Sequence, residues 1–194
     1  MAQKQNRNFY AKSILEYGIS AQGVHWNSSF TQYKRFEILT QFITQDIHNS
    51  SIIDVGCGMG EYYNYLMNES LKPKTYQGID CEESMIGISK KRYPRAHFEI
   101  QNVLSDPLFK ADYYVCSGAM NILEKNEFYS FIENCYQSCT KGFAFNFLKK
   151  DRYTDITKEE IVSFCKNLTP NIQTKDNYLD NDYSIFLQKE KHVL

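Results

Sequence analysis

The chain has 194 residues, which is the size of one domain and leaves no room for a second catalytic domain. Hydrophobic residues make up 42% and charged residues 23%, a globular composition that argues against disorder and against a fibrous architecture. The net charge of −1 creates no broad field that would attract phosphates, so no DNA partner is expected.

The first elements in the chain are helical. Residues 10–17 predict a short helix that stops at Gly18, a usual place for a chain to leave helical geometry. A loop is expected over 19–29. Apolar residues then recur near helical spacing over 30–46 and predict a helix with one buried face. Residues 1–49 thus form an N-terminal region, and the core of the same single domain is expected at 50–189.

The core combines strands with helices. From Ser51 onward, short apolar runs alternate with helical patterns, which predicts an α/β fold with a parallel sheet covered by helices on both faces. Strands are expected at 51–55, 74–79, 97–100, 112–117 and 142–148. Helices are expected at 61–68, 82–92, 127–139 and 157–167, and the last of these opens with a capping box from Thr157 to Glu160.

The chain ends with two apolar runs, 172–178 and 183–188, that have no helix between them. The connection of four residues, 179–182, is too short for a parallel crossover, so the two runs should form an antiparallel hairpin.

A glycine-rich turn is the most informative motif. An apolar strand at 52–55 leads directly into Gly56, Gly58 and Gly60, and a helical pattern starts immediately afterwards. Side chains at these positions would keep a ligand away from the backbone N–H groups and would resist positive φ angles. The pattern predicts a ligand-binding turn, although glycines in such a turn can also serve tight packing alone.

Asp80 narrows the choice of ligand. It lies 20 residues after Gly60, at the end of the second predicted strand, where a carboxylate can accept both ribose hydroxyls of an adenosine ligand. A dinucleotide site would need a third glycine where this chain has Glu61, whose negative charge would oppose the phosphates. A cationic sulfonium cofactor is therefore favoured, because it tolerates carboxylates such as Asp54 and Glu61.

With these residues the sequence resembles the class I S-adenosylmethionine-dependent methyltransferases over about residues 50–189. The specific part is the run from Asp54 to Gly60. The resemblance implies a Rossmann-like three-layer sandwich whose mostly parallel, seven-stranded sheet ends in an antiparallel hairpin. It also implies S-adenosylmethionine as cofactor, with S-adenosylhomocysteine as product.

The resemblance assigns roles to individual residues. It places the three glycines along the methionine moiety, Asp80 at the ribose, and Cys81 and Met85 beside the adenine. Asn102 stands where the family often has an acidic residue, and its amide oxygen can still accept a hydrogen bond from the adenine amino group. The predicted cofactor-binding residues are Asp54, Gly56, Gly58, Gly60, Asp80, Cys81, Met85, Asn102, Val103 and Ser117.

The acceptor side is expected at residues 117–121, from which the family reaches the methyl group and the substrate. This segment lacks the Asn-Pro-Pro-Tyr motif of amino-methylating nucleic-acid enzymes and offers no acidic ligands for magnesium. Asn121 is predicted to contact the acceptor. The six cysteines form no CxxC pair and no cluster with histidine, so no metal site is expected.

The N-terminal region carries further candidates. His25 and Trp26 lie in a loop of the kind that forms a lid or binding surface; the alternative is that Trp26 anchors the N-terminal helices on the domain. His25 is the candidate general base, because an imidazole can take up a proton near neutral pH. Arg35 shares a helix face with Gln32 and could clamp a carboxylate of cofactor or acceptor; the alternative is a solvated helix face.

The sequence therefore predicts a methyltransferase that acts on a small-molecule acceptor by in-line displacement. Methylation of a protein or tRNA, and a regulatory protein that binds the cofactor without catalysis, are the alternatives, and a dehydrogenase is least favoured. No run of ~20 apolar residues and no signal-like segment is present, so a cytoplasmic protein that is not in a membrane is expected. The sequence predicts no oligomeric state.

Overall fold

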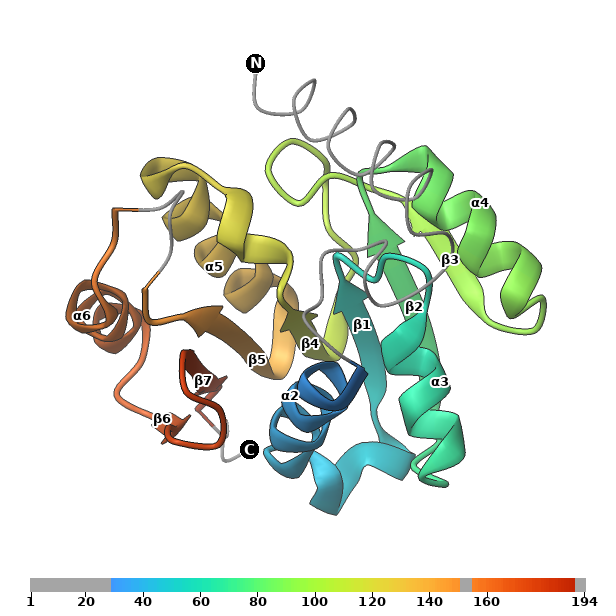
Figure 1. The fold of residues 1–194 in the computed structure, drawn as a ribbon, viewed down its shortest axis with the longest axis horizontal. Helices are drawn as coiled ribbons and strands as arrows, with labels where there is room; N and C mark the ends of the chain where they lie inside the picture. The colour runs from blue at the N-terminus through green and yellow to red at the C-terminus, as the bar shows by residue number, and fades with distance from the viewer. Residues whose placement is uncertain (1–28, 151–154, 191–194) are drawn as a thin grey trace.

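The computed structural model describes residues 29–150 and 155–190 of the chain (Figure 1). The predicted helix at 10–17 and most of the loop that follows it lie outside these ranges. Among the described residues, no helix has the length and apolar character needed to cross a membrane.

Seven strands form a single sheet in the order β3-β2-β1-β4-β5-β7-β6. Neighbouring strands from β3 to β5 pair in parallel, whereas β7 is antiparallel to both β5 and β6. The predicted fold class and the terminal hairpin are therefore confirmed. The strands are β1 (Ser51–Val55), β2 (Thr75–Asp80), β3 (His97–Ile100), β4 (Ala111–Ser117), β5 (Cys139–Leu148), β6 (Ile172–Lys175) and β7 (Asp182–Gln188).

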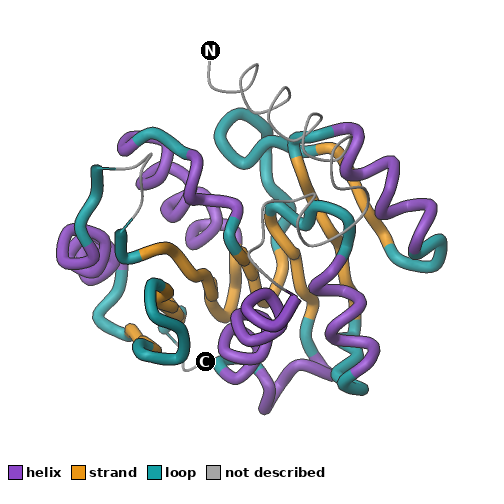
Figure 2. The backbone as a smooth tube through the Cα atoms, in the orientation of Figure 1, coloured by secondary structure: helices purple, strands orange, loops and turns teal. Residues whose placement is uncertain are grey.

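Helices cover both faces of the sheet and complete three layers (Figure 2). Successive side chains of β1 point to opposite faces, so Ile52 packs among the helices of one layer and Ile53 among those of the other. The first layer holds α2 (Ser29–Gln41), the 3-10 helix η2 (Thr44–Asn49), α3 (Glu61–Asn68) and α4 (Glu83–Arg92). The second holds α5 (Lys125–Ser138) and α6 (Lys158–Leu168).

The strand order determines where a ligand can bind. β1 lies between β2 and β4, and the chain returns across the sheet from β3 to β4. In an open α/β sheet the crevice at the carboxyl ends of the strands, at such a reversal, is the usual ligand site. The glycine turn follows β1 directly at this edge.

The predicted helix at 30–46 was wrong in its last turn. The α-helix ends at Gln41, and the N–H groups of Phe42 and Ile43 bond three residues back, to the carbonyls of Leu39 and Thr40. The Thr44 hydroxyl donates to the Thr40 carbonyl (2.7 Å), so a side chain competes with the backbone for the α-helical acceptor. The chain tightens into η2 instead.

The predicted helix at 127–139 was displaced from α5. The observed helix α5 begins at Lys125 because Glu124 forms a capping box with Glu127, although glutamate is not among the usual capping residues. Cys139 already belongs to β5, which therefore starts three residues before the predicted strand. In α6 the predicted capping box of Thr157 and Glu160 is confirmed.

Candidate functional site

The glycine turn has the conformation that its sequence requires. Gly56, Gly58 and Gly60 have φ angles of 69°, 51° and 84°, in the left-handed region that side chains disfavour. A Cβ atom at Gly58 would meet no atom within 4 Å, so the turn borders open space there. A Cβ at Gly56 would lie 2.2 Å from the Cβ of Ala119. Gly56 is therefore required by packing, and Gly58 leaves room for a ligand.

Asp80 fastens this turn to the end of β2. Its Oδ2 accepts the N–H of Gly58 (2.9 Å), and its Oδ1 accepts the N–H of Glu82 (2.9 Å). The Ile79 carbonyl also accepts the N–H groups of Gly56 and Cys57. Burial raises the pKa of Asp80, while the backbone hydrogen bonds lower it. The structure thus brings Asp80 and the glycine turn together, as the sequence predicts.

Asp54 is a buried carboxylate at the end of β1. The Tyr76 hydroxyl donates to its Oδ2 (2.6 Å). Burial raises the pKa of Asp54 to about 7, and the negative charge of Asp80 adds to the rise, whereas the Tyr76 hydrogen bond opposes it. A cation bound nearby would favour the ionised form of this carboxylate.

Glu61 is paired with a cation. Nη1 of Arg92 donates to Oε1 of Glu61 (2.5 Å) and to the Met59 carbonyl (2.9 Å). The guanidinium of Arg92 offsets the negative charge of Glu61, so Glu61 would repel a pyrophosphate less strongly than the sequence predicts. The sequence reasoning missed Arg92, which lies at the far end of α4.

Of the predicted adenine-side residues, Cys81 directly follows β2, Met85 lies in the first turn of α4, and Asn102 and Val103 lie shortly after β3. Cys81 is exposed, whereas Met85 and Val103 are buried. Oδ1 of Asn102 accepts the N–H of Leu104 (3.0 Å), so this oxygen already takes part in a local turn. Its contact with adenine stays a prediction.

Gln101 was not predicted, yet it presents an unusual acceptor. Its Nε2 donates to the Pro107 carbonyl (2.6 Å), while its Oε1 is buried and has no hydrogen-bond partner among the described residues. Buried polar atoms are normally paired, so this oxygen is a candidate hydrogen-bond acceptor for a ligand. The only signal in the sequence is the position of Gln101 directly after a strand.

Ser117 and Asn121 lie at the end of β4. Oγ of Ser117 is buried and finds no partner within the part of the chain that the structure describes. Nδ2 of Asn121 donates to the Gly118 carbonyl, and its Oδ1 accepts the N–H of Leu148, both at 3.4 Å. The short 3-10 helix η3 (Ala119–Ile122) brings Ala119 against Gly56. The expected acceptor segment therefore borders the glycine turn.

Arg35 lies on α2 but is not on a solvated face. Its Nε and Nη2 donate to Oδ1 (2.5 Å) and Oδ2 (3.0 Å) of Asp182, the first residue of β7. Gln32 on the same helix is buried as well. The alternative of a solvent-facing helix surface was therefore wrong, and the guanidinium clamps a carboxylate of this chain. His25 and Trp26 lie outside the described residues.

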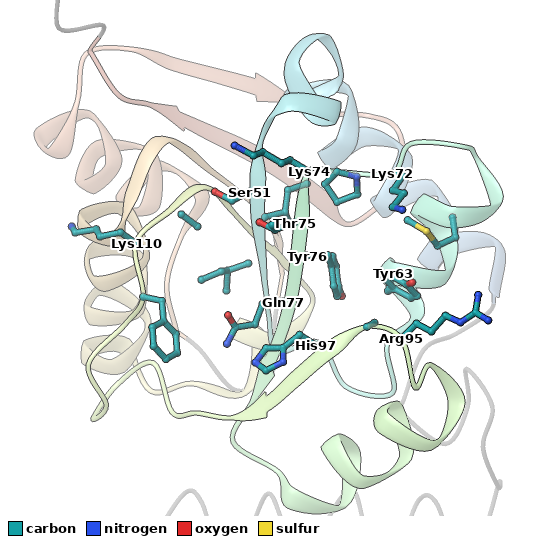
Figure 3. A pocket seen from close by; sticks show the side chains of 17 residues that line it. Ser51, Tyr63, Lys72, Lys74, Thr75, Tyr76, Gln77, Arg95, His97 and Lys110 are labelled. Carbon is teal, nitrogen blue, oxygen red and sulfur yellow. The ribbon is translucent and has the colours of Figure 1, made fainter.

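A separate hollow of about 470 Å³ lies at the opposite edge of the sheet (Figure 3). It is bordered by the first residues of four strands, Ser51, Thr75, His97 and Ala111. The basic side chains around it, Lys72, Lys74, Arg95 and Lys110, extend in different directions in Figure 3. The hollow is therefore distinct from the crevice at the glycine turn, and its cations do not line that crevice.

Comparisons with known proteins agree with this geometry. Residues 52–142 match the family described as a methyltransferase domain. Protein 235L of Invertebrate iridescent virus 6 is 31% identical over 90 residues, which cover 44% of this chain and 34% of the viral protein. The chain thus spans about a third of that relative.

Two further proteins resemble the chain over most of its length. The ubiquinone/menaquinone biosynthesis C-methyltransferase UbiE of Campylobacter jejuni is 23% identical over 203 residues, covering 95% of this chain and 80% of UbiE. The magnesium protoporphyrin IX methyltransferase of Synechocystis, crystallised with S-adenosylhomocysteine, superposes with a TM-score of 0.65 at 11% identity. That superposition covers 82% of this chain and 84% of the other, and it shows a shared fold.

Proposed function

We propose that this chain, which belongs to the class I S-adenosylmethionine-dependent methyltransferase family, transfers a methyl group to a small-molecule acceptor. The acceptor class is supported by the name of UbiE, which assigns it to quinone biosynthesis, and by the alignment along 95% of this chain. The name of the Synechocystis protein likewise specifies a porphyrin. The net charge of −1 and the position of the basic hollow at the far edge also support a small acceptor over a nucleic acid.

The open space beside Gly58 is the observation that carries the proposal. This edge of the sheet holds the three glycines of the turn, two carboxylates and a serine hydroxyl that has no hydrogen-bond partner among the described residues. These groups fit S-adenosylmethionine. Gly58 lets the ligand approach the turn, and Asp80 is the proposed ribose acceptor. The charge of Asp54 would favour a cationic ligand. Ser117 and Gln101 offer hydrogen-bonding atoms that have no partner within residues 29–150 and 155–190.

When bound, S-adenosylmethionine supplies a methyl group on a positively charged sulfur. The protein then has to align the acceptor and exclude water from the site. Asn121 is the residue proposed to align the acceptor. His25 and Trp26 are proposed to act from the N-terminal segment, His25 as the base that takes up the acceptor proton. His25→Gln should then lower kcat and leave the dissociation constant of S-adenosylhomocysteine unchanged, as titration calorimetry would show.

Calorimetry with S-adenosylmethionine and S-adenosylhomocysteine tests the donor half of the proposal. Saturable 1:1 binding of both is expected, and NAD should not compete. No heat of binding at millimolar ligand would overturn the assignment of this site.

A methyl-transfer assay tests the acceptor half. Labelled S-adenosylmethionine is incubated with separate pools of phenols and quinols, porphyrins, total tRNA, and protein lysate. Labelling of a small-molecule pool is expected. Labelling of tRNA or protein alone would replace the small acceptor by a macromolecule. Cofactor binding without transfer to any pool would favour a regulatory protein that binds the cofactor.

A further inference from the structure

A buried polar chain connects helix α2 with the loop after β4. Asp182 accepts two hydrogen bonds from Arg35, and its Oδ1 also accepts one from Nδ2 of Asn146 (2.9 Å). Oδ1 of Asn146 in turn accepts the N–H of Gly118 (3.1 Å). We infer that Arg35, Asp182 and Asn146 form a relay of positioning residues that holds the acceptor-side segment 117–121 in place. This inference rests on the proposed function.

The direction of every bond in the relay is determined by chemistry. A guanidinium only donates and a carboxylate only accepts, so Asn146 must present its amide nitrogen to Asp182. The backbone N–H of Gly118 only donates, so the same side chain must present its oxygen to Gly118. Leucine at position 146 could fill the space but could not accept the Gly118 N–H. The relay therefore has one arrangement.

Burial makes this arrangement rigid. The Asp182 side chain is 4% exposed, the Arg35 side chain 12%, and Asn146 is fully buried. A charge taken out of water is tolerated only when it is paired and hydrogen-bonded, so loss of any member leaves an unsatisfied partner. α2 packs against β4, β5 and β7, and Arg35 on this helix reaches Asp182, the first residue of β7.

The relay ends at the border of the methyl-transfer site. Gly118 has a φ of 75° and caps η3, and it lies between Ser117, whose Oγ has no partner among the described residues, and Ala119, which packs on Gly56. The position of the Gly118 N–H therefore determines where Ser117 and Ala119 lie relative to the glycine turn. Apolar side chains could stabilise this buried interface as well as the Arg35–Asp182 ion pair does, so stability alone does not explain the pair. What apolar side chains could not provide is the chain of hydrogen bonds that ends at the Gly118 N–H.

Hydrogen exchange measured by mass spectrometry tests the relay without an acceptor. Arg35→Lys keeps the charge but loses the two-pronged contact, and Asp182→Asn keeps the size but loses the charge. Both should speed exchange of the peptide covering 117–121 about tenfold, the effect of losing one hydrogen bond to a charged group. If Asp182→Asn does not fold, hydrogen exchange in Arg35→Lys alone tests the relay.

Thr40→Val is the matched control. It removes a buried hydrogen bond from the same helix, between Thr40 and the Tyr62 hydroxyl (3.0 Å), which lies outside the relay. Exchange at 117–121 should stay at the wild-type rate in this variant. Equal acceleration in Thr40→Val and Arg35→Lys would overturn the relay, because the loop would then respond to any weakening of α2.

Kinetics complete the test. With whichever acceptor the transfer assay identifies, Arg35→Lys should lower kcat about tenfold, while KM for S-adenosylmethionine and the dissociation constant of S-adenosylhomocysteine change less than threefold. Unchanged exchange at 117–121 in Arg35→Lys and Asp182→Asn overturns the relay. Failure of the wild-type protein to bind S-adenosylhomocysteine overturns the proposed function instead, so the two failures are distinguishable.

Discussion

The two sides of the proposed site are built in different ways. The donor side consists of one strand, one glycine turn and the end of the next strand, and it is held by backbone hydrogen bonds to Ile79 and Asp80. The acceptor side is held by side chains from α2, β5 and β7, and two of these residues, Arg35 and Asp182, are 147 positions apart in the sequence. A short stretch of chain therefore specifies the donor side, whereas the acceptor side depends on how the whole sheet is assembled.

The largest effect is expected from substitutions in the glycine turn. Gly56→Ala combines a positive φ, which costs about 1–2 kcal/mol, with a collision against Ala119, which costs about 1–3 kcal/mol more. Gly58→Ala carries only the first cost, but its methyl group enters the space proposed for the ligand. Urea unfolding should show the greater loss of stability for Gly56→Ala.

Calorimetry should show the opposite order for ligand binding. Gly58→Ala is expected to weaken S-adenosylhomocysteine binding at least about tenfold while most of its stability remains. If Gly58→Ala binds S-adenosylhomocysteine as tightly as the wild type, the space beside Gly58 is not the donor site.

The next largest effect is expected at Asp80. Asp80→Asn retains one acceptor oxygen and turns an NH2 group toward a backbone N–H, so it disturbs both the turn and the proposed ribose contacts. S-adenosylhomocysteine should bind about 10- to 100-fold more weakly, because hydrogen bonds to a charged group are lost. Glu83→Gln, an exposed change nearby on α4, is the control and should bind normally.

Asp54 should show opposite effects on stability and binding. Its pKa is raised from an ordinary value near 3.8 to about 7, so the folded state holds the proton more tightly than the unfolded state. The stability that this proton contributes is present at low pH and is lost as the pH rises through about 7. Asp54→Asn should therefore raise the free energy of unfolding at pH 8.5 by about 2–4 kcal/mol and change it little at pH 4.

The same variant should bind S-adenosylmethionine more weakly at pH 8.5, because a negative charge near the cation is lost. Asp112→Asn is the matched control at the opposite edge of the sheet. Burial raises the pKa of Asp112, but hydrogen bonds from Ser51 and Thr140 to its carboxylate outweigh burial, so the pKa is lowered. This variant should lose stability and keep its affinity. A loss of stability in Asp54→Asn at pH 8.5 would contradict the burial argument.

The smallest effect is expected at Asn121. Both of its hydrogen bonds are 3.4 Å long, so Asn121→Ala should change the free energy of unfolding by less than about 1 kcal/mol. Loss of an acceptor contact would lower kcat and leave S-adenosylhomocysteine binding unchanged. A loss of binding as large as that of Asp80→Asn would show that Asn121 belongs to the donor side.

Much of the donor side could be predicted because its residues are close in the sequence or in adjacent strands. Val55 pairs with Ile79, so the glycine turn after β1 and Asp80 at the end of β2 necessarily meet. The partner of Glu61 could not be predicted in this way. Arg92 reaches Glu61 from the far end of α4, and nothing in the local pattern of either residue indicates that contact.

The acceptor side offered weaker signals. Asn146 interrupts an otherwise apolar run in β5, and a fully buried amide in such a strand needs partners, but the sequence does not show which. The sequence pattern places Asp182 in the predicted polar connection, 179–182, between the last two strands. Its carboxylate meets Asn146 only because β7 inserts beside β5, where Asp182 pairs with Leu148.

By itself the sequence determined the α/β class, the glycine turn, Asp80 and the terminal hairpin, since these depend on side-chain periodicity and on backbone conformations that only certain residues adopt. The tertiary structure alone decided the pairing of Arg35 with Asp182 and of Glu61 with Arg92. It also decided which buried atoms of Gln101 and Ser117 have no partner in the part of the chain that the structure describes. Those features depend on the strand order and on helix packing, which bring together side chains that no local pattern relates.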